Sequence, residues 1–309
     1  MNDLIRQAIA AEAEERVDSR TVLANLHKAR KRKPLGMIVG VATLTVAAAA
    51  TAVVIPTTIK KTDAAPAVQP PAATGQNVLL IGTDDVGNTD AIVFARFEAD
   101  GSAAVISLPR DIYVGSSTDR INGLYQSDPA KLTSAVEDLT GAKVDHYAAV
   151  KMSDFGGIAT AVGGVEVCLN NAVKDIHTGA RFEAGKQVLQ GDQAALFLRQ
   201  RNNLPNGDLD RVRRHQAFLA SLASKITKDN AATLARAVGG SIKVDAGFDV
   251  LEFAQRFQGP VKIRTTTLPV GEPVQRGSLS GFAPDPGQAK QFVDGYLDGK
   301  GAAETGCVD

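Results

Sequence analysis

The longest apolar stretch of the chain runs from residue 35 to residue 59. It contains no charged residue, whereas Lys33 precedes it and Lys60 follows it. As a helix rising about 1.5 Å per residue, the stretch spans roughly 37 Å, which is enough for the hydrocarbon core of a bilayer. The pattern therefore predicts one N-terminal transmembrane helix over residues 35–59.

The charges that flank this stretch predict its orientation. The basic residues Lys28 and Arg30 to Lys33 precede it, and only Lys60 and Lys61 follow at once. By the positive-inside rule, residues 1–34 form a cytoplasmic basic segment and the rest of the chain lies outside the cell. A cleaved signal peptide is the alternative, but the apolar run exceeds the roughly 7–15 residues of a secretory core and follows a long polar segment. We therefore expect an uncleaved anchor in the plasma membrane.

The two segments beside the anchor differ in composition. Leu4, Ile5, Ala8 and Ile9 recur at helical spacing, which is typical of a short amphipathic helix on the inner membrane surface; a solvated topology signal is the alternative. Residues 60–76 are rich in Ala, Pro and Gln, the composition of an extended extracellular stalk.

From residue 77 onward, short apolar runs alternate with segments of helical periodicity. The expected strands are Val78–Ile81, Ala91–Phe97, Ala103–Leu108, Tyr147–Val150 and Val261–Pro269. The expected helices are Lys131–Leu139, Phe155–Val162 closed by Gly163 and Gly164, Gln193–Arg199, Arg211–Ile226, Leu234–Val238, Val250–Phe257 and Gln288–Leu297. This mixture, without an internal repeat, favours a single α/β (α+β) domain over residues 77–309, with a central mixed β-sheet flanked by helices.

Composition and charge narrow the function classes. The 309 residues are 44% apolar, which supports a sizeable core, and the 34 basic residues balance the 34 acidic ones. A neutral chain without tryptophan gives no support for nucleic acid as a partner. Both cysteines, Cys168 and Cys307, fall on the predicted outer side, where disulfides persist. We expect them to be bonded; two unpaired thiols are the alternative, and a catalytic cysteine is disfavoured because neither lies beside a base in the sequence.

Aspartates at predicted strand ends suggest a cation site. Asp84 follows the strand Val78–Ile81 through a Gly-Thr turn, and Asp90 opens the next strand, so their side chains are able to converge at one sheet edge. Carboxylates placed in this way hold Mg²⁺ together with phosphate oxygens and water. A surface loop is the alternative for an Asp pair taken alone.

Arginines accumulate in the same kind of position. Arg110 follows an apolar strand, Arg199 and Arg201 end a helical segment, and Arg211 and Arg214 open the next helix. Guanidinium groups are planar, permanently charged forks that suit phosphate oxygens, so their joint density indicates a pyrophosphate ligand. A surface ion pair is the alternative for each arginine taken singly.

Several strings in sequence order resemble the LytR-CpsA-Psr family between residues 77 and 226. The matching pieces are Asn-Val-Leu-Leu-Ile-Gly-Thr-Asp (77–84), Thr-Asp-Ala (89–91), Ser-Leu-Pro-Arg-Asp (107–111), Arg-Ile-Asn (120–122), Asp-His-Tyr (145–147), Gly-Gly-Val-Glu-Val (163–167), Ala-Gly-Lys (184–186), Leu-Gln-Gly-Asp-Gln-Ala-Ala (189–195), Arg-Gln-Arg (199–201) and Asp208 with Arg211 and Arg214. Because the pieces are specific and occur in order, a chance match is disfavoured as an explanation.

The resemblance implies an extracytoplasmic domain with a long apolar cavity for a polyprenyl chain and a Mg²⁺-dependent site at its mouth. The implied reaction is transfer of a glycopolymer phosphate from a polyprenyl-pyrophosphate carrier to a peptidoglycan hydroxyl. By position, Asp84 and Asp90 correspond to the metal-binding acids, and Arg110, Arg199, Arg201 and Arg211 to the pyrophosphate clamp; Asp84, Asp90, Arg110 and Arg211 are thus the implied catalytic residues. Asp111 and Arg214 are further candidates for pyrophosphate binding, and Asn122 for orienting a neighbour.

The chain departs from the family pattern at two positions. Asn88 stands where an arginine is usual, and His215 stands where a glutamine is expected, with Gln216 as its substitute after a register change. For His215 we expect a helix surface rather than a proton shuttle. Two other functions remain as alternatives: a non-catalytic receptor for a lipid-linked glycan, and a hydrolase of the pyrophosphate. The short segment 1–34 argues against a DNA-binding domain on the inner side.

Overall fold

A six-stranded mixed sheet forms the centre of the computed structural model. The structure describes residues 75–309 except 228, 231–233, 235–239, 256–258, 302, 304 and 305. The strand order is β10-β3-β2-β1-β4-β9. The strands are β1 (Gln76–Thr83), β2 (Thr89–Phe97), β3 (Ser102–Leu108), β4 (His146–Lys151), β9 (Ile242–Val244) and β10 (Lys262–Thr267). Strands β1, β2 and β3 form an antiparallel meander, whereas β4 lies parallel to β1 and β10 parallel to β3.

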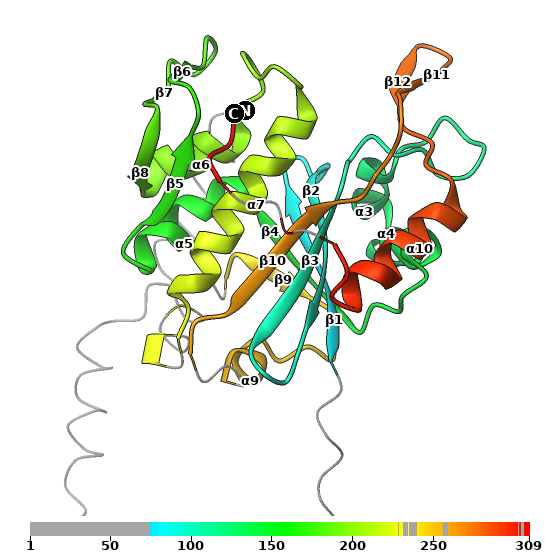
Figure 1. The fold of residues 1–309 in the computed structure, drawn as a ribbon, viewed down its shortest axis with the longest axis horizontal. Helices are drawn as coiled ribbons and strands as arrows, with labels where there is room; N and C mark the ends of the chain where they lie inside the picture. The colour runs from blue at the N-terminus through cyan, green and yellow to red at the C-terminus, as the bar shows by residue number, and fades with distance from the viewer. Residues whose placement is uncertain are drawn as a thin grey trace, which may run out of the picture. The chain divides into compact units, whose positions relative to one another are not determined.

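One face of the sheet packs against helices α4 (Pro129–Thr140) and α10 (Pro286–Leu297), as Figure 1 shows. Alternate strand residues, among them Leu79, Ile81 and Phe94, point into this core and are almost fully buried. Both helices begin with an aspartate cap followed by proline: the Asp128 side chain accepts from Ala130 N, and that of Asp285 from Gln288 N.

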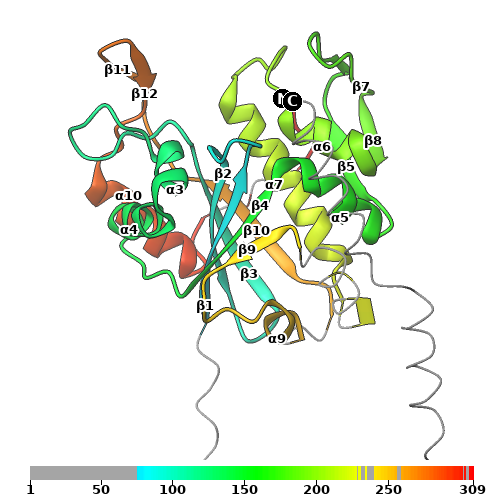
Figure 2. The ribbon, with the colours of Figure 1, turned by 180° about the vertical axis from the view of Figure 1, so that it is seen from behind.

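The other face is covered by α5 (Phe155–Ala161), α6 (Gly191–Arg199) and α7 (Asp208–Lys225), on the opposite side of the sheet in both views (Figures 1 and 2). The intervening strand residues, such as Val93 and Val105, face this side and pack with Ala223 of α7. Gly163 and Gly164, both with positive φ (78° and 100°), close α5 as predicted. The two core layers therefore lie on the two faces of one sheet.

Within the described residues, three two-stranded antiparallel sheets complete the domain. Strand β5 (Val165–Leu169) pairs with β8 (Gly185–Leu189), β6 (Val173–Lys174) with β7 (Arg181–Phe182), and β11 (Val274–Arg276) with β12 (Leu279–Gly281). Short helices η1 (Ile121–Gly123), α3 (Leu124–Ser127), η2 (Met152–Asp154) and α9 (Val250–Gln255) link the main elements.

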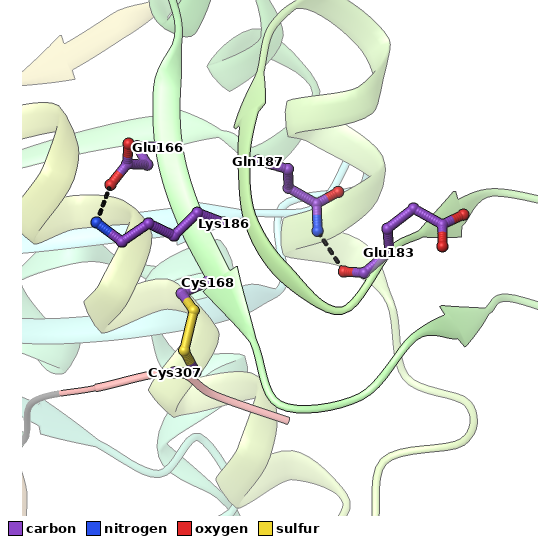
Figure 3. Close-up of a disulfide and its surroundings, with 6 residues drawn as sticks. All are labelled: Glu166, Cys168, Glu183, Lys186, Gln187 and Cys307. Atoms are coloured by element: carbon purple, nitrogen blue, oxygen red, sulfur yellow. Dashed lines mark hydrogen bonds and ion pairs between the residues drawn. A yellow bond between two sulfur atoms is a disulfide. The ribbon is translucent and has the colours of Figure 1, made fainter.

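The Cys168–Cys307 disulfide joins β5 to the segment near residue 309, so the predicted pairing is present in the structure (Figure 3). The pair is 139 residues apart in sequence. Beside it, Val308 donates its N–H to the Cys168 carbonyl at 2.9 Å and forms a parallel bridge with Leu169. The end of the chain thus lies as a short extra strand along β5.

The α/β class with a central mixed sheet and flanking helices is confirmed, and so are most predicted elements. Only Leu234 of the predicted helix Leu234–Val238, and only Val250–Gln255 of the predicted helix Val250–Phe257, belong to the described residues. Among the helices that the structure describes, none combines the length and apolar character needed to cross a bilayer. The predicted segments 1–34, 35–59 and most of 60–76 lie outside the described residues.

Candidate functional site

The predicted acids and arginines meet at one edge of the sheet because of the strand directions. Strand β1 ends at Thr83, which pairs with Thr89 at the start of antiparallel β2, and β3 ends at Leu108 beside Ile92. Asp84, Asp90 and Arg110 therefore emerge at the same edge, one from each strand.

Asp90 is the centre of an arginine cluster. Its Oδ1 lies 2.8 Å from a guanidinium nitrogen of each of Arg110, Arg201 and Arg211. Burial by itself would raise the pKa of the Asp90 carboxyl, but the charge and hydrogen bond of Arg211, with the charges of Arg201 and Arg110, hold that pKa below its usual value. We call Asp90, Arg110, Arg201 and Arg211 the arginine cluster. All three of these contacts are made at Oδ1.

The three arginines differ in exposure, which separates their roles. Arg211 is only 2% exposed; it donates to the Asp90 backbone carbonyl at 3.1 Å and to Asp208 Oδ1 at 3.2 Å. Arg201 is half exposed and contacts Asp90 from the end of α6. Arg211 therefore fixes the cluster from beneath, while Arg201 is the cation most accessible to a ligand from solvent.

Arg110 lies between three carboxylates. Besides Asp90, its Nε lies 3.0 Å from Asp208 Oδ2 and 3.8 Å from Asp111 Oδ2. Asp111 in turn forms a salt bridge with Arg120, whose Nη1 lies 2.7 Å from Asp111 Oδ1. The backbone N–H of Asn122, the predicted orienting residue, donates to the Arg110 carbonyl at 3.2 Å. Asn122 thus positions Arg110 through its main chain.

The loop between β1 and β2 organises Asp84. One Asp84 carboxylate oxygen accepts the backbone N–H groups of Val86 (3.0 Å) and Asn88 (2.8 Å), and the other accepts Asn88 Nδ2 at 2.9 Å. Asn88, which replaces the usual arginine, therefore orients a carboxylate instead of supplying a charge. The neighbouring Asp85 has Arg199 at 3.8 Å, so the structure places Arg199 beside the loop, where it is exposed.

Asp84 and Asp90 fit a magnesium ion only if water and substrate supply most of its ligands. Among the described residues, no three His, Cys, Asp or Glu side chains gather into a metal-binding group. Mg²⁺ typically takes one or two carboxylates and completes its shell with waters and substrate phosphate oxygens. Asp84 and Asp90 would supply the one or two carboxylates of such a site, and water and phosphate oxygens would complete its shell.

Arg214 contacts residues outside the arginine cluster. It is buried, it lies 5.1 Å from the Phe197 ring centroid, and it donates to Gln200 Oε1 and to the Asp309 backbone carbonyl, both at 2.6 Å. Burial lowers its pKa to about 10, and the nearby Asp210 and Asp309 oppose that shift, so it stays charged at neutral pH. Its contacts brace Gln200, the residue between Arg199 and Arg201.

The expectation that His215 lies on a helix surface is wrong. His215 is buried, and because its Nε2 lies 2.8 Å from the Leu198 carbonyl, this nitrogen carries the proton. Burial, reinforced by the charge of Arg211, lowers the His215 pKa to about 3, so the ring is neutral. The neighbouring Gln216 donates to Thr266 O and Thr267 Oγ1 of β10, which ties it to the sheet rather than to the cluster.

An apolar cavity of about 270 Å³ begins next to the arginine cluster. It lies between the sheet and the helices on its second face, and Gly82, Ala91 and His215 line it beside the cluster. Val93, Val105, Phe218, Leu219, Leu222, Phe248 and Phe253 also belong to its lining. The volume is near the lower end of the roughly 300–1,000 Å³ of ligand pockets, and the nearly unbroken apolar lining suits a hydrocarbon chain.

The sequence did not reveal the roles of three residues in the site. Asp208, Arg120 and Gln200 occur in the matching strings, but nothing in a string shows that Asp208 joins two arginines, that Arg120 pairs with Asp111, or that Gln200 receives Arg214. These are contacts between segments up to 98 residues apart, and only the fold specifies them.

Comparisons with known proteins support the resemblance. The model of the LytR_cpsA_psr family matches residues 42–294. The cell wall biosynthesis protein LcpA of Corynebacterium glutamicum is 37% identical over 233 residues, covering 62% of this chain and 45% of LcpA. The polyisoprenyl-teichoic acid–peptidoglycan teichoic acid transferase TagU of Enterococcus faecalis is 30% identical over 190 residues, covering 56% of this chain and 62% of TagU. This chain thus spans less than two thirds of either relative.

Among solved structures, the LytR-Csp2A-Psr enzyme from Actinomyces oris aligns with a TM-score of 0.60 and 23% identity, covering 73% of this chain and 90% of that one. This likeness establishes the fold. Together with the family match over most of the sequence, it shows that the chain belongs to the LytR-CpsA-Psr family.

Proposed function

We propose that this protein transfers a glycopolymer phosphate from a polyprenyl-pyrophosphate carrier to a peptidoglycan hydroxyl. The observation that carries the proposal is the convergence of Arg110, Arg201 and Arg211 on Asp90, at 2.8 Å each, directly beside an apolar cavity. A ligand with a doubly charged phosphate head and a long hydrocarbon tail matches both halves of this arrangement.

The arginines are placed to stabilise negative charge on a phosphate group, not to form a covalent bond with it. In phosphoryl transfer, negative charge spreads over the equatorial phosphate oxygens, and catalysis comes largely from positioning and charge stabilisation. Arg201 is open to solvent for this purpose, while buried Arg211 keeps Asp90 and Asp208 in place. Mg²⁺ bound by Asp84 and Asp90 would neutralise further charge on the same oxygens.

The names of the relatives support the choice of substrates. TagU is named for a polyisoprenyl-linked teichoic acid as donor and peptidoglycan as acceptor, and LcpA for cell wall biosynthesis. For this chain, we extend these to a polyprenyl-pyrophosphate-linked glycopolymer and a peptidoglycan acceptor. The predicted helix over 35–59 would anchor the enzyme in the plasma membrane with its catalytic domain outside, where both substrates occur.

A transfer assay with the full-length chain in detergent tests the proposal. The chain is incubated with a polyprenyl-pyrophosphate oligosaccharide, Mg²⁺ and peptidoglycan fragments, and the products are separated by mass spectrometry. The expected product is glycan phosphate attached to peptidoglycan, with one polyprenyl phosphate released per transfer. Release of glycan phosphate to water alone would show a hydrolase, and tight donor binding without turnover would show a receptor.

Two arginine variants, one inside the arginine cluster and one outside it, test whether the activity depends on the cluster. Arg201→Ala removes the exposed cation of the cluster, whereas Arg181→Ala removes an exposed arginine from the β6–β7 hairpin. Loss of transfer in the first variant alone would link the activity to the cluster. Equal losses in both variants would contradict that link.

A further inference from the structure

A groove of about 820 Å³ lies beside the start of helix α10. Its walls are the segment that follows β10 and the segment that leads into α10. Residues of its lining include Glu272, Ala283, Asp285, Gln288, Gln291 and Phe292. We call it the α10 groove. Its volume falls within the roughly 300–1,000 Å³ of small-molecule sites.

Both walls of the α10 groove are bonded to the loop that follows β3. Strand β10 runs parallel to β3 and ends at the same edge of the sheet, where Leu268 N donates to the Ser107 carbonyl at 2.9 Å. Pro269, the next residue, lines the groove. On the other wall, Phe282 N donates to the Asp111 carbonyl at 3.0 Å, and the residue after Phe282 lines the groove. The groove therefore begins directly beside the loop that supplies one arginine of the arginine cluster.

The α10 groove and the apolar cavity lie on opposite faces of the sheet. Helix α10 packs through Ala289 and Val293 on one face, whereas the cavity lies beneath α7 on the other (Figures 1 and 2). In phosphoryl transfer, the attacking oxygen and the leaving oxygen lie roughly in line through the phosphorus. In the proposed function the polyprenyl phosphate leaves on the side of the cavity, so the acceptor hydroxyl approaches from the other side. That is the side of the groove.

The side chains of the α10 groove suit an uncharged sugar chain. Gln288 and Gln291 are exposed and three positions apart, so they lie on one face of α10. Their amides both donate and accept hydrogen bonds, as the hydroxyl and acetamido groups of sugars require. The half-buried ring of Phe292 belongs to the same lining and is stacked with Tyr296 at 6.3 Å between centroids. An aromatic ring held in this way packs well against the C–H groups of a sugar ring.

Charge separates the α10 groove from the arginine cluster. Two carboxylates, of Glu272 and Asp285, line the groove, and none of the described residues in the lining is basic. Asp285 Oδ1 also accepts the Gln288 N–H at 2.8 Å, which fixes the carboxylate at the start of the helix. Carboxylates accept hydrogen bonds from sugar hydroxyls but repel phosphate groups. The groove therefore favours an uncharged glycan over a polymer that carries phosphates.

We infer that the α10 groove binds the glycan strand of the peptidoglycan acceptor. Gln288 and Gln291 supply its hydrogen bonds, and Phe292 supplies the ring on which a sugar packs. This inference rests on the proposed function, which names the acceptor. The bound strand presents its hydroxyl to the phosphate held by the arginine cluster. The groove residues therefore set the affinity for the acceptor, whereas the arginine cluster and the cavity set the affinity for the donor.

A binding experiment without donor tests the inference. The full-length chain in detergent is titrated calorimetrically with a soluble peptidoglycan glycan oligomer from which the peptides have been removed. We expect saturable binding to the wild type and about tenfold weaker binding to Gln288→Ala/Gln291→Ala, because two hydrogen-bonding groups are lost. Both positions are exposed on a helix, where alanine preserves the fold. The matched control is Gln255→Ala, which removes an exposed glutamine from α9, and it should bind the oligomer as the wild type does.

A second variant and the transfer assay complete the test. Phe292→Leu retains apolar contact with the core but removes the ring, so it should also weaken glycan binding. In the transfer assay, the double glutamine variant should raise the KM for peptidoglycan about tenfold and leave kcat and donor affinity within about twofold of the wild type.

The outcomes distinguish the inference from the proposed function. Equal glycan affinity of the wild type and the double variant would overturn the inference alone, and so would binding of a free stem peptide in place of the glycan. A wild type that binds the glycan through the two glutamines but performs no transfer would refute the proposed function and confirm the groove as a glycan site.

Discussion

Arg214 donates from Nη1 to Gln200 Oε1 at 2.6 Å, and from Nε to the backbone carbonyl of Asp309 at the same distance. This arginine thereby connects helix α7, the loop that carries Arg201, and the segment tethered by the disulfide. The resemblance makes Arg214 a further candidate for pyrophosphate binding, whereas its contacts give it a bracing role.

Arg214→Ala should therefore act mainly on stability. It leaves a buried amide and a partly buried carbonyl without their donor, which costs about 3 kcal/mol of unfolding free energy. Urea denaturation measures this loss. The control is Arg213→Ala, since Arg213 is half exposed and should cost below about 1 kcal/mol. An unchanged denaturation midpoint together with lost donor binding would instead show that Arg214 binds the pyrophosphate.

The disulfide should stabilise the domain by restricting its unfolded state. Closing a loop of 139 residues contributes about 5 kcal/mol on the chain-entropy model. The double variant Cys168→Ser/Cys307→Ser should lose a large part of this amount in thermal and urea unfolding, and a reducing agent should do the same to the wild type but not to the variant. If reduction leaves the wild-type unfolding midpoint unchanged, the bond carries no such stabilisation.

Arg110→Ala and Arg201→Ala should both reduce turnover about 100-fold, because each removes one charge-stabilising donor. Their effects on stability should differ. Arg201 is half exposed, so its loss should cost below about 1 kcal/mol. Arg110 separates three carboxylates and is only 19% exposed, so its loss should cost about 2 kcal/mol. Arg201→Ala should therefore leave stability nearly unchanged, whereas Arg110→Ala should lower it. Full activity of the Arg201 variant would contradict the assignment of the arginine cluster as the active site.

His215 should make the domain sensitive to acid. Its folded pKa of about 3 lies below the ordinary value of 6.5, so the unfolded state binds more protons between these pH values and stability falls as pH falls through this window. The loss should reach about 2 kcal/mol at pH 5 relative to pH 7.5.

His215→Gln checks this prediction, because the amide is able to keep the hydrogen bond to the Leu198 carbonyl and does not titrate. The difference in unfolding free energy between pH 7.5 and pH 5 should be smaller in the variant by about the same 2 kcal/mol. Identical pH profiles for the two proteins would mean that His215 is solvated.

The main strands and helices were predictable from sequence for two reasons: β1, β2 and β3 contain apolar runs bounded by polar or turn residues, and α7 and α10 repeat apolar residues at helical spacing. The two-stranded sheets were missed because strands of two to five residues, such as β6 and β8, carry too little periodicity. The arginine cluster was predicted in outline, since its members follow strand and helix ends. The burial of His215 and the separation of Arg214 were not, because both depend on which face of α7 meets α6 and the sheet.

The central claim is that the arginine cluster and the apolar cavity bind one lipid pyrophosphate together. A crystal structure of the full-length chain with a polyprenyl pyrophosphate and Mg²⁺ tests it most directly. We predict phosphate oxygens within hydrogen-bond distance of Arg110 and Arg201, and the hydrocarbon chain between Val93 of β2 and Leu219 of α7. A lipid bound elsewhere on the domain, with Arg110 and Arg201 making no contact with its phosphates, would contradict the claim.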